Sequence, residues 1–160
     1  MNELRHQESI VIAAAPDEIY RVVSDVTRTG EWSPICVGCR WDDDDVPGPD
    51  GPQVGAWFIG TNVTPQRTWE TRSVVTVADR PHEFAWSVGE GWVEWGYRLR
   101  AVDGGTELTE RWHLTPAGEA RFAELYGDQA TEQIAERRSA ALRGIPATLA
   151  RIKDIVEADG

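Results

Sequence analysis

Residues 9–36, SIVIAAAPDEIYRVVSDVTRTGEWSPIC, decide the fold of this chain. Ile10 and Ile12 share one face of an extended backbone, a spacing typical of a strand with one buried side. Pro16 then fits the first turn of a helix, where its missing N–H is not needed, and the two acidic residues after it suit the positive end of that helix. The stretch therefore predicts a strand, followed within residues 16–30 by two short helices.

Six further strands are predicted downstream of this opening unit. They cover residues 36–42, 54–63, 68–78, 82–89, 92–102 and 106–114. Short turn sequences separate most of them, such as Asp79-Arg80-Pro81 and Asp103-Gly104-Gly105. Because strands joined by short turns pair side by side in opposite directions, the pattern predicts an antiparallel sheet of about seven strands.

The last third of the chain has a helical pattern. Residues 117–126 predict a short helix and residues 129–158 a long one. One face of the long helix carries a series of apolar residues: Ile134, Ala141, Leu142, Ile145, Leu149, Ile152 and Val156. A sheet with one apolar face needs a cover, and only this helix is long enough to supply it, so the sequence predicts an α+β fold.

The order of these signals resembles the START-like (SRPBCC) superfamily and, within it, the polyketide cyclase/dehydrase type. The resemblance is carried by Trp32-Ser33-Pro34, the aromatic and glycine residues from Gly55 to Asn62, Trp69, Phe84-Ala85-Trp86, Gly105-Thr106 and the long terminal helix. It implies a single domain over residues 1–160 with the helix-grip fold, in which a curved antiparallel sheet surrounds a long C-terminal helix. It also implies an internal cavity for a small apolar molecule, although members of the family do not share one chemistry.

Acidic residues dominate the charge of the chain. Its 27 acidic and 16 basic residues leave a formal net charge of −11, which disfavours nucleic acid as a partner and insertion into a membrane. The acidic run at residues 42–45 lacks the glycine and the distal glutamate of a calcium loop, so we expect a solvated hairpin tip there. Met1–Arg5 leads into a strand rather than into the apolar segment of a signal peptide, and we expect a cytoplasmic protein.

Aromatic side chains are predicted to gather on the inner face of the sheet. The chain has eight tryptophans but only three phenylalanines, and period-2 alternation points several of the tryptophans the same way. For residues 54–63 the alternation is ambiguous, and the resemblance favours Phe58 and Asn62 pointing inward. The predicted ligand-binding residues are Phe58, Asn62, Trp69, Trp86, Trp95, Tyr97, Glu110, Trp112, Ile145 and Leu149. The alternative is a packed core without a cavity.

Glu110 is a polar residue in an apolar row, with Leu108 and Trp112 two positions away on either side. A buried carboxylate is costly unless it is paired or protonated. Glu110 is therefore a weak catalytic candidate, either as a general base or as a hydrogen-bond donor to a ligand carbonyl. The alternative is a structural ion pair with one of four arginines, Arg67, Arg72, Arg98 or Arg138. Asn62 likewise either orients a ligand or satisfies a backbone group.

Cys36 and Cys39 have the spacing of a redox or metal-binding motif. Residues three apart in a regular strand point to opposite faces, and neither cysteine begins a helix, whose dipole would lower the pKa of a thiol. One cysteine pair is only half of a zinc site, and His6, His82 and His113 lie at unrelated spacings. We therefore expect two buried or half-buried thiols without activation, no metal site and no cofactor.

Three classes of function remain open from the sequence. The first is a protein that binds a small apolar molecule, such as a lipid, a polyketide or an aromatic metabolite. The second, implied by the resemblance, is an aromatase or cyclase that folds a reactive chain in its cavity and supplies few polar groups. The third is a protein-interaction module, which would need a large exposed apolar patch. A homodimer is compatible with each class.

Overall fold

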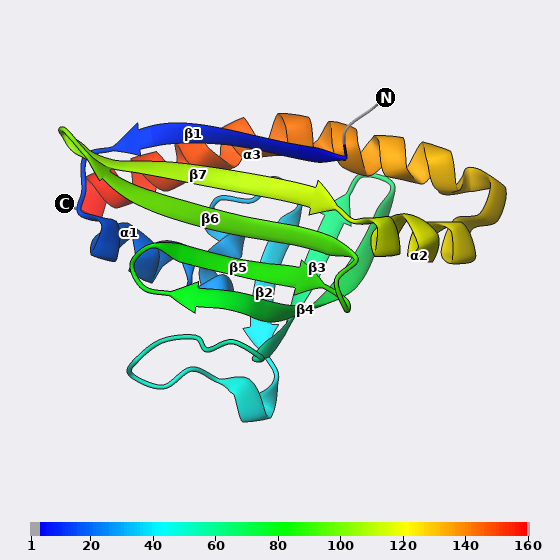
Figure 1. Cartoon of the computed structure of the whole chain (residues 1–160), viewed down its shortest axis with the longest axis horizontal. Helices are drawn as coiled ribbons and strands as arrows, with labels where there is room; N and C mark the ends of the chain where they lie inside the picture. The colour runs from blue at the N-terminus through cyan, green and yellow to red at the C-terminus, as the bar shows by residue number, and fades with distance from the viewer. Residues whose placement is uncertain (1–3, 160) are drawn as a thin grey trace.

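The computed structural model describes residues 4–159 and confirms the predicted α+β helix-grip architecture (Figure 1). In chain order the elements are β1 (Arg5–Ile12), α1 (Pro16–Val23), η1 (Val26–Glu31), β2 (Cys36–Trp41), η2 (Asp43–Asp45), β3 (Trp57–Thr64), β4 (Arg67–Asp79), β5 (Glu83–Val88), β6 (Val93–Val102), β7 (Gly105–Leu114), α2 (Pro116–Tyr126), η3 (Gly127–Gln129) and α3 (Ala130–Asp159), where η marks a 3-10 helix. The first three residues of the Met1–Arg5 segment lie outside the described residues.

The seven strands form one antiparallel sheet in the order β1-β7-β6-β5-β4-β3-β2. Strands β2 to β7 follow one another as a meander, whereas β1 pairs with β7 at the far edge. Consecutive strands β1 and β2 therefore lie at opposite edges of the sheet. The chain between them, which contains α1 and η1, crosses from one edge to the other and closes part of the opening between them (Figure 1).

Strand β1 begins earlier than the sequence pattern indicated. It starts at Arg5, which pairs with His113 of β7, whereas the alternation of apolar residues becomes visible only near Ile10. Its first residues are mostly polar and give no signal of burial. The strand extends through them because its backbone pairs with β7, an interaction that does not depend on the side chains.

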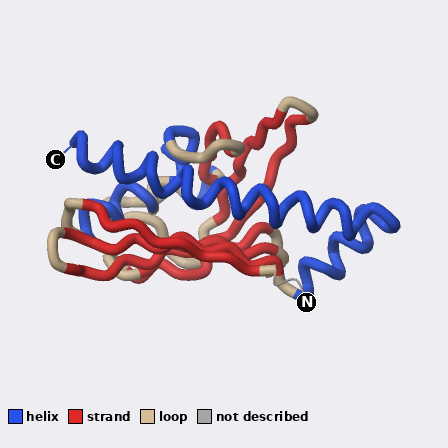
Figure 2. Tube along the Cα trace, turned by 90° about the horizontal axis from the view of Figure 1, so that it is seen from above, coloured by secondary structure: helices blue, strands red, loops and turns tan. Residues whose placement is uncertain are grey.

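The long helix α3 crosses the concave side of the sheet, and Figure 2 shows it running over the strands for most of its length. Its buried residues include Ile145, Leu149 and Ile152, as the apolar stripe predicted. The C-terminal half is held at β1, where the Lys153 Nζ donates a hydrogen bond of 2.9 Å to the Val11 carbonyl oxygen. Although α3 is 30 residues long, no helix within residues 4–159 is apolar enough to cross a membrane.

Candidate functional site: an internal cavity

A cavity of about 690 Å³ lies between the inner face of the sheet and α3, a size typical of sites for small molecules. Strands β2 to β7 line one side, and α1, η1, α2, α3 and the segments before β2 and β6 contribute the rest. The predicted residues that line it are Phe58, Asn62, Trp69, Trp86, Trp95, Tyr97, Glu110, Trp112 and Ile145. The predicted strand faces therefore converge on one enclosure, and the alternative of a core without a cavity is wrong.

Leu149 is the exception among the predicted residues, because it does not line the cavity. It is 2% exposed and belongs to the hydrophobic core. It lies one helical turn beyond Ile145 along α3, and the cavity wall on this helix ends at Thr148. The apolar stripe of the helix thus continues past the cavity, where it serves packing alone.

Aromatic rings form much of the cavity wall. Trp86 lies at its centre, with its ring centroid 6.2 Å from that of Phe58 and 5.8 Å from that of Tyr97. Phe58 also packs edge-on against Trp41, at 5.4 Å, and Trp41 itself lies outside the cavity. Such tilted and edge-on pairs hold one another in place, so the wall is a rigid apolar surface suited to a flat or aliphatic ligand.

Tyr97 and Glu110 place a polar pair in this apolar wall. They are opposite each other on neighbouring strands β6 and β7, and they are 3% and 5% exposed. Burial raises the pKa of Glu110 well above its usual value, and a hydrogen bond with Tyr97 opposes that rise in part. Burial likewise raises the pKa of Tyr97, with the neighbouring Glu110 as a further cause. The pair therefore favours a protonated carboxyl beside a neutral phenol.

Glu110 has unused hydrogen-bonding capacity. Its Oε1 is buried and has no hydrogen-bond partner, and the ion pairs found among residues 4–159 do not include it. The hypothesis of an arginine partner is not supported, since Arg72 pairs with Asp42 at 2.6 Å and Arg98 with Glu83 at 3.5 Å. Glu110 lines the cavity, so a ligand group that reaches its carboxyl would meet one oxygen without a hydrogen-bond partner.

Asn62 is used by the protein itself. Its side-chain amide donates to the Trp69 carbonyl oxygen at 3.4 Å and to the Thr71 hydroxyl at 3.3 Å. Both acceptors lie on β4, the neighbouring strand. Of the two predicted roles, satisfying sheet groups is the one that the structure displays, and Asn62 also lines the cavity.

The α2 end of the cavity combines cations with aromatic rings. Thr115 caps α2 by accepting a hydrogen bond of 3.0 Å from the Gly118 backbone N–H, and the helix then carries Arg121 to the cavity. The Arg121 guanidinium lies 4.9 Å from the Trp92 ring centroid, and that of Arg137 lies 5.6 Å from Trp69. This end can accept a negatively charged part of a ligand.

Sequence reasoning missed the contribution of α2 to the site, because the strand alternation that identified the inner face does not apply to a helix. It also missed the cavity position of the two cysteines. They lie on the same face of β2, contrary to the prediction, because the pairing of β2 with β3 shifts register between Cys36 and Gly38. Val37 is the extra residue and is 59% exposed, so the bulge turns Cys36 toward the side of Cys39. Both thiols are free and half-buried, as predicted.

Hydrogen bonding and burial act differently on the two thiols, and the expectation that neither is activated stays a prediction. A hydrogen bond from Cys39 is the largest cause that lowers the pKa of Cys36, which falls to about 7 although burial opposes it. The same interaction, together with burial, raises the pKa of Cys39. The pair therefore favours a thiolate at Cys36 and a thiol at Cys39.

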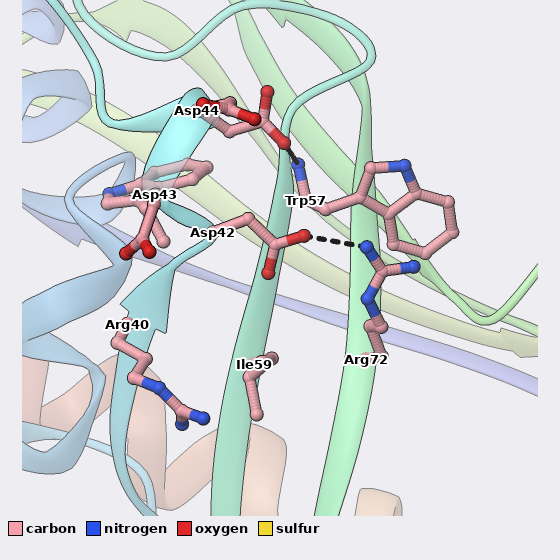
Figure 3. Close-up of a pocket in the computed structure, with 9 residues that line it drawn as sticks. Arg40, Asp42, Asp43, Asp44, Trp57, Ile59 and Arg72 are labelled. Carbon is pink, nitrogen blue, oxygen red and sulfur yellow. Dashed lines mark hydrogen bonds and ion pairs between the residues drawn. The ribbon is translucent and has the colours of Figure 1, made fainter.

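A second hollow lies beside the acidic loop and shares only Trp57 and Arg72 with the lining of this cavity (Figure 3). Its acidic rim is the run at residues 42–45, which folds partly as η2 instead of remaining an irregular hairpin tip. Asp45 accepts a hydrogen bond of 3.0 Å from the Trp57 backbone N–H, and Arg72 stacks over the Trp57 ring at 4.2 Å. Asp42 pairs with Arg72, so part of this acidic charge serves to hold the loop on the sheet.

Comparison with known proteins decides the family of the chain. Residues 3–152 match the family described as polyketide cyclase / dehydrase and lipid transport. The chain belongs to this family. No match was found among curated proteins.

Solved structures agree with membership of the polyketide cyclase / dehydrase family. A polyketide-cyclase-like protein from Corynebacterium glutamicum is 49% identical, with a TM-score of 0.70 and coverage of 99% of this chain and 94% of that one. A protein from Nitrosomonas europaea is 12% identical, with a TM-score of 0.69 and coverage of 99% and 97%. The di-domain ARO/CYC protein StfQ of the steffimycin biosynthetic pathway is 14% identical, with a TM-score of 0.68 and coverage of 98% of this chain and 51% of that one. The last two similarities show the fold alone.

Proposed function

We propose that this member of the polyketide cyclase / dehydrase family binds a small apolar molecule, such as a lipid, a polyketide or an aromatic metabolite, in the cavity between the sheet and α3. The observation that carries the proposal is the cavity volume of about 690 Å³ with an aromatic wall. Two features refine it. The pair Tyr97 and Glu110 suits a carbonyl or hydroxyl group deep in the site, and the arginines at the α2 end suit a polar end of the same ligand.

The apolar fluorescent probe N-phenyl-1-naphthylamine tests the proposal. We expect it to bind and to quench tryptophan emission, because several tryptophans line the same enclosure. Trp95→Ala should weaken binding about tenfold, since it removes a large aromatic contact from the wall. Titration of tryptophan emission with the probe measures both effects.

Trp41→Ala is the matched control, because Trp41 packs behind the wall rather than in it. Trp41→Ala should change the affinity for the probe by about twofold at most. Equal losses at Trp41 and Trp95 would contradict the proposed binding site. Native mass spectrometry of the purified protein, with a search for a small molecule that co-purifies, then identifies the natural ligand class.

A second candidate function, a cyclase or aromatase, is favoured by the chemistry of the Tyr97–Glu110 pair. A protonated carboxyl can donate a proton to a ligand carbonyl as its oxygen gains charge, and general acid catalysis of this kind contributes about 100-fold or more to a rate. Glu110→Gln keeps the shape of the side chain but removes its proton transfer.

Turnover of a poly-β-carbonyl chain separates the two candidates. If the protein is a cyclase, Glu110→Gln should reduce turnover about 100-fold and leave binding of the chain largely intact. If it only binds, the wild type should show no turnover, and Glu110→Gln should shift the affinity by about 1–2 kcal/mol at most, the scale of one buried hydrogen bond. The third class, an interaction module, has less support, because within residues 4–159 the exposed large apolar residues are few and come from β1, β2, β3, α2 and the loop between β2 and β3: Val11, Val37, Val46, Val54, Val63 and Leu125.

A further inference from the structure

The two cysteines form a thiol pair on the cavity wall. The Sγ atoms of Cys36 and Cys39 are 3.5 Å apart, a hydrogen-bonding distance for sulfur that is longer than a disulfide bond. Gly60 of β3 lies beside them, and a methyl group at that position would lie 3.4 Å from each sulfur. Because glycine has no side chain, both sulfurs can lie close to the backbone of β3, and all three residues line the cavity.

The surroundings of the pair distinguish its two sulfurs. The Cys36 backbone N–H donates one hydrogen bond of 2.9 Å to the Ser33 hydroxyl, and the Cys36 thiol donates to the Gly38 carbonyl oxygen at 3.4 Å. The pKa of Cys36 is lowered chiefly by the Cys39 thiol and further by the backbone of Gly38 and Thr61. Either thiol can be the donor in the contact between them, and with Cys39 as the donor this hydrogen bond and burial both raise the pKa of Cys39. Cys36 is thus the more nucleophilic sulfur near neutral pH.

Few ionisable side chains lie on the elements around the Cys36 sulfur. Strand β3, which pairs with β2, has no ionisable side chain, and on η1 the arginine and glutamate pair with each other through Arg28 and Glu31 at 2.7 Å. Tyr97 is the ionisable group of the opposite wall whose pKa responds to Cys36. The thiol pair and the Tyr97–Glu110 pair therefore face one enclosure, with a nucleophile on one side and hydrogen-bond donors on the other.

We propose that Cys36 is a nucleophile of the cavity that forms a covalent bond with an apolar α,β-unsaturated carbonyl compound, and that Cys39 positions its sulfur. The inference rests on the proposed function, since the compound must first bind in the cavity. It narrows the ligand class to molecules that combine an apolar body with a carbonyl group conjugated to a carbon–carbon double bond.

The reaction needs no oxidant, reductant or second substrate. The Cys36 thiolate adds to the β-carbon, so that a C–S bond forms, the C=C π bond breaks, and its electron pair moves to the carbonyl oxygen as an enolate. Donors such as Tyr97 and the protonated Glu110 can stabilise that oxygen. The enolate then takes a proton at the α-carbon, which replaces the proton that Cys36 released to solvent. The product is a saturated ketone joined to the protein by a thioether.

Chalcone and dihydrochalcone test this inference as a matched pair, since they share one carbon skeleton and differ in the conjugated double bond. At pH 7.5 we expect chalcone to add once to the wild type, seen as one increment in the intact mass and as loss of the enone absorbance. The protein has only two cysteines, so Cys36→Ser and Cys39→Ser each leave a single thiol. Cys36→Ser should abolish the adduct, whereas Cys39→Ser should slow its formation about tenfold by removing the hydrogen-bond donor.

Dihydrochalcone separates the covalent step from binding. It should bind reversibly to the wild type and to Cys36→Ser, which also shows that the variant is folded, and it should protect Cys36 of the wild type from chalcone. If dihydrochalcone binds but chalcone forms no adduct, modifies Cys39 equally, or leads only to a Cys36–Cys39 disulfide, the inference is wrong and the proposed function stands. If dihydrochalcone does not bind at all, the inference and the proposed function are both wrong for apolar aromatic ketones.

Discussion

Gly30→Ala should lower the free energy of unfolding by about 3 kcal/mol and the melting temperature by about 10 °C. A Cβ atom at Gly30 would overlap the backbone carbonyl of Val37, which cannot move aside as a flexible side chain could. In the wild type the backbone of Gly30 lies close to the Val37 carbonyl, and this approach holds η1 against β2. Since η1 leads directly to Trp32, a cavity residue that is 4% exposed, the substitution should also weaken binding of the apolar probe. Thermal denaturation and probe titration measure the two effects.

Gly38→Ala is the matched control for this substitution. Gly38 lies in β2, close to the same contact, but a Cβ atom there would have no neighbour within 4 Å. We expect its melting temperature to stay within about 2 °C of the wild type. If the two alanine variants were equally stable, the close approach of η1 to β2 would not contribute to the native structure.

Glu110→Gln should make the protein more stable than the wild type at pH 8 but not at pH 4. The folded protein holds the Glu110 proton at pH values where the unfolded chain has released it, because burial raises the pKa in the folded state. The contribution of Glu110 to stability is therefore complete below the pKa of the unfolded chain, about 4.3, and declines as the pH rises toward the folded value. Glutamine does not ionise, so the variant avoids this loss.

The size of the effect follows from the cost of a buried carboxylate. We expect the difference in unfolding free energy to move in favour of the variant by about 2 kcal/mol between pH 4 and pH 8, which corresponds to about 6 °C in melting temperature. Glu107→Gln, on the other face of β7, is the control, because Glu107 is partly exposed and pairs with Arg100 at 2.9 Å. If the difference in unfolding free energy between Glu110→Gln and the wild type did not change with pH, the Glu110 carboxyl would not be desolvated.

The strands and their inner faces could be predicted from the sequence because they depend on local alternation. The apolar row Leu108, Trp112 and Leu114 marked the buried face of β7, and the polar Glu110 within it was recognisable for the same reason. The stripe on α3 likewise identified the covering helix. The stripe also led to the prediction that Leu149 lines the cavity, which is wrong. An apolar stripe indicates burial but does not distinguish a cavity wall from a packed core.

The sequence by itself determined the elements, their order and the side of each strand that is apolar, since these follow from patterns within a few residues. Only the tertiary structure decided the pairing of β1 with β7, the placement of α2 at one end of the cavity, and the meeting of Cys36 with Cys39. Each of these depends on contacts between distant segments. The bulge that brings the thiols together exists because β2 must match the register of β3, and alternation along a single strand carries no information about its partner.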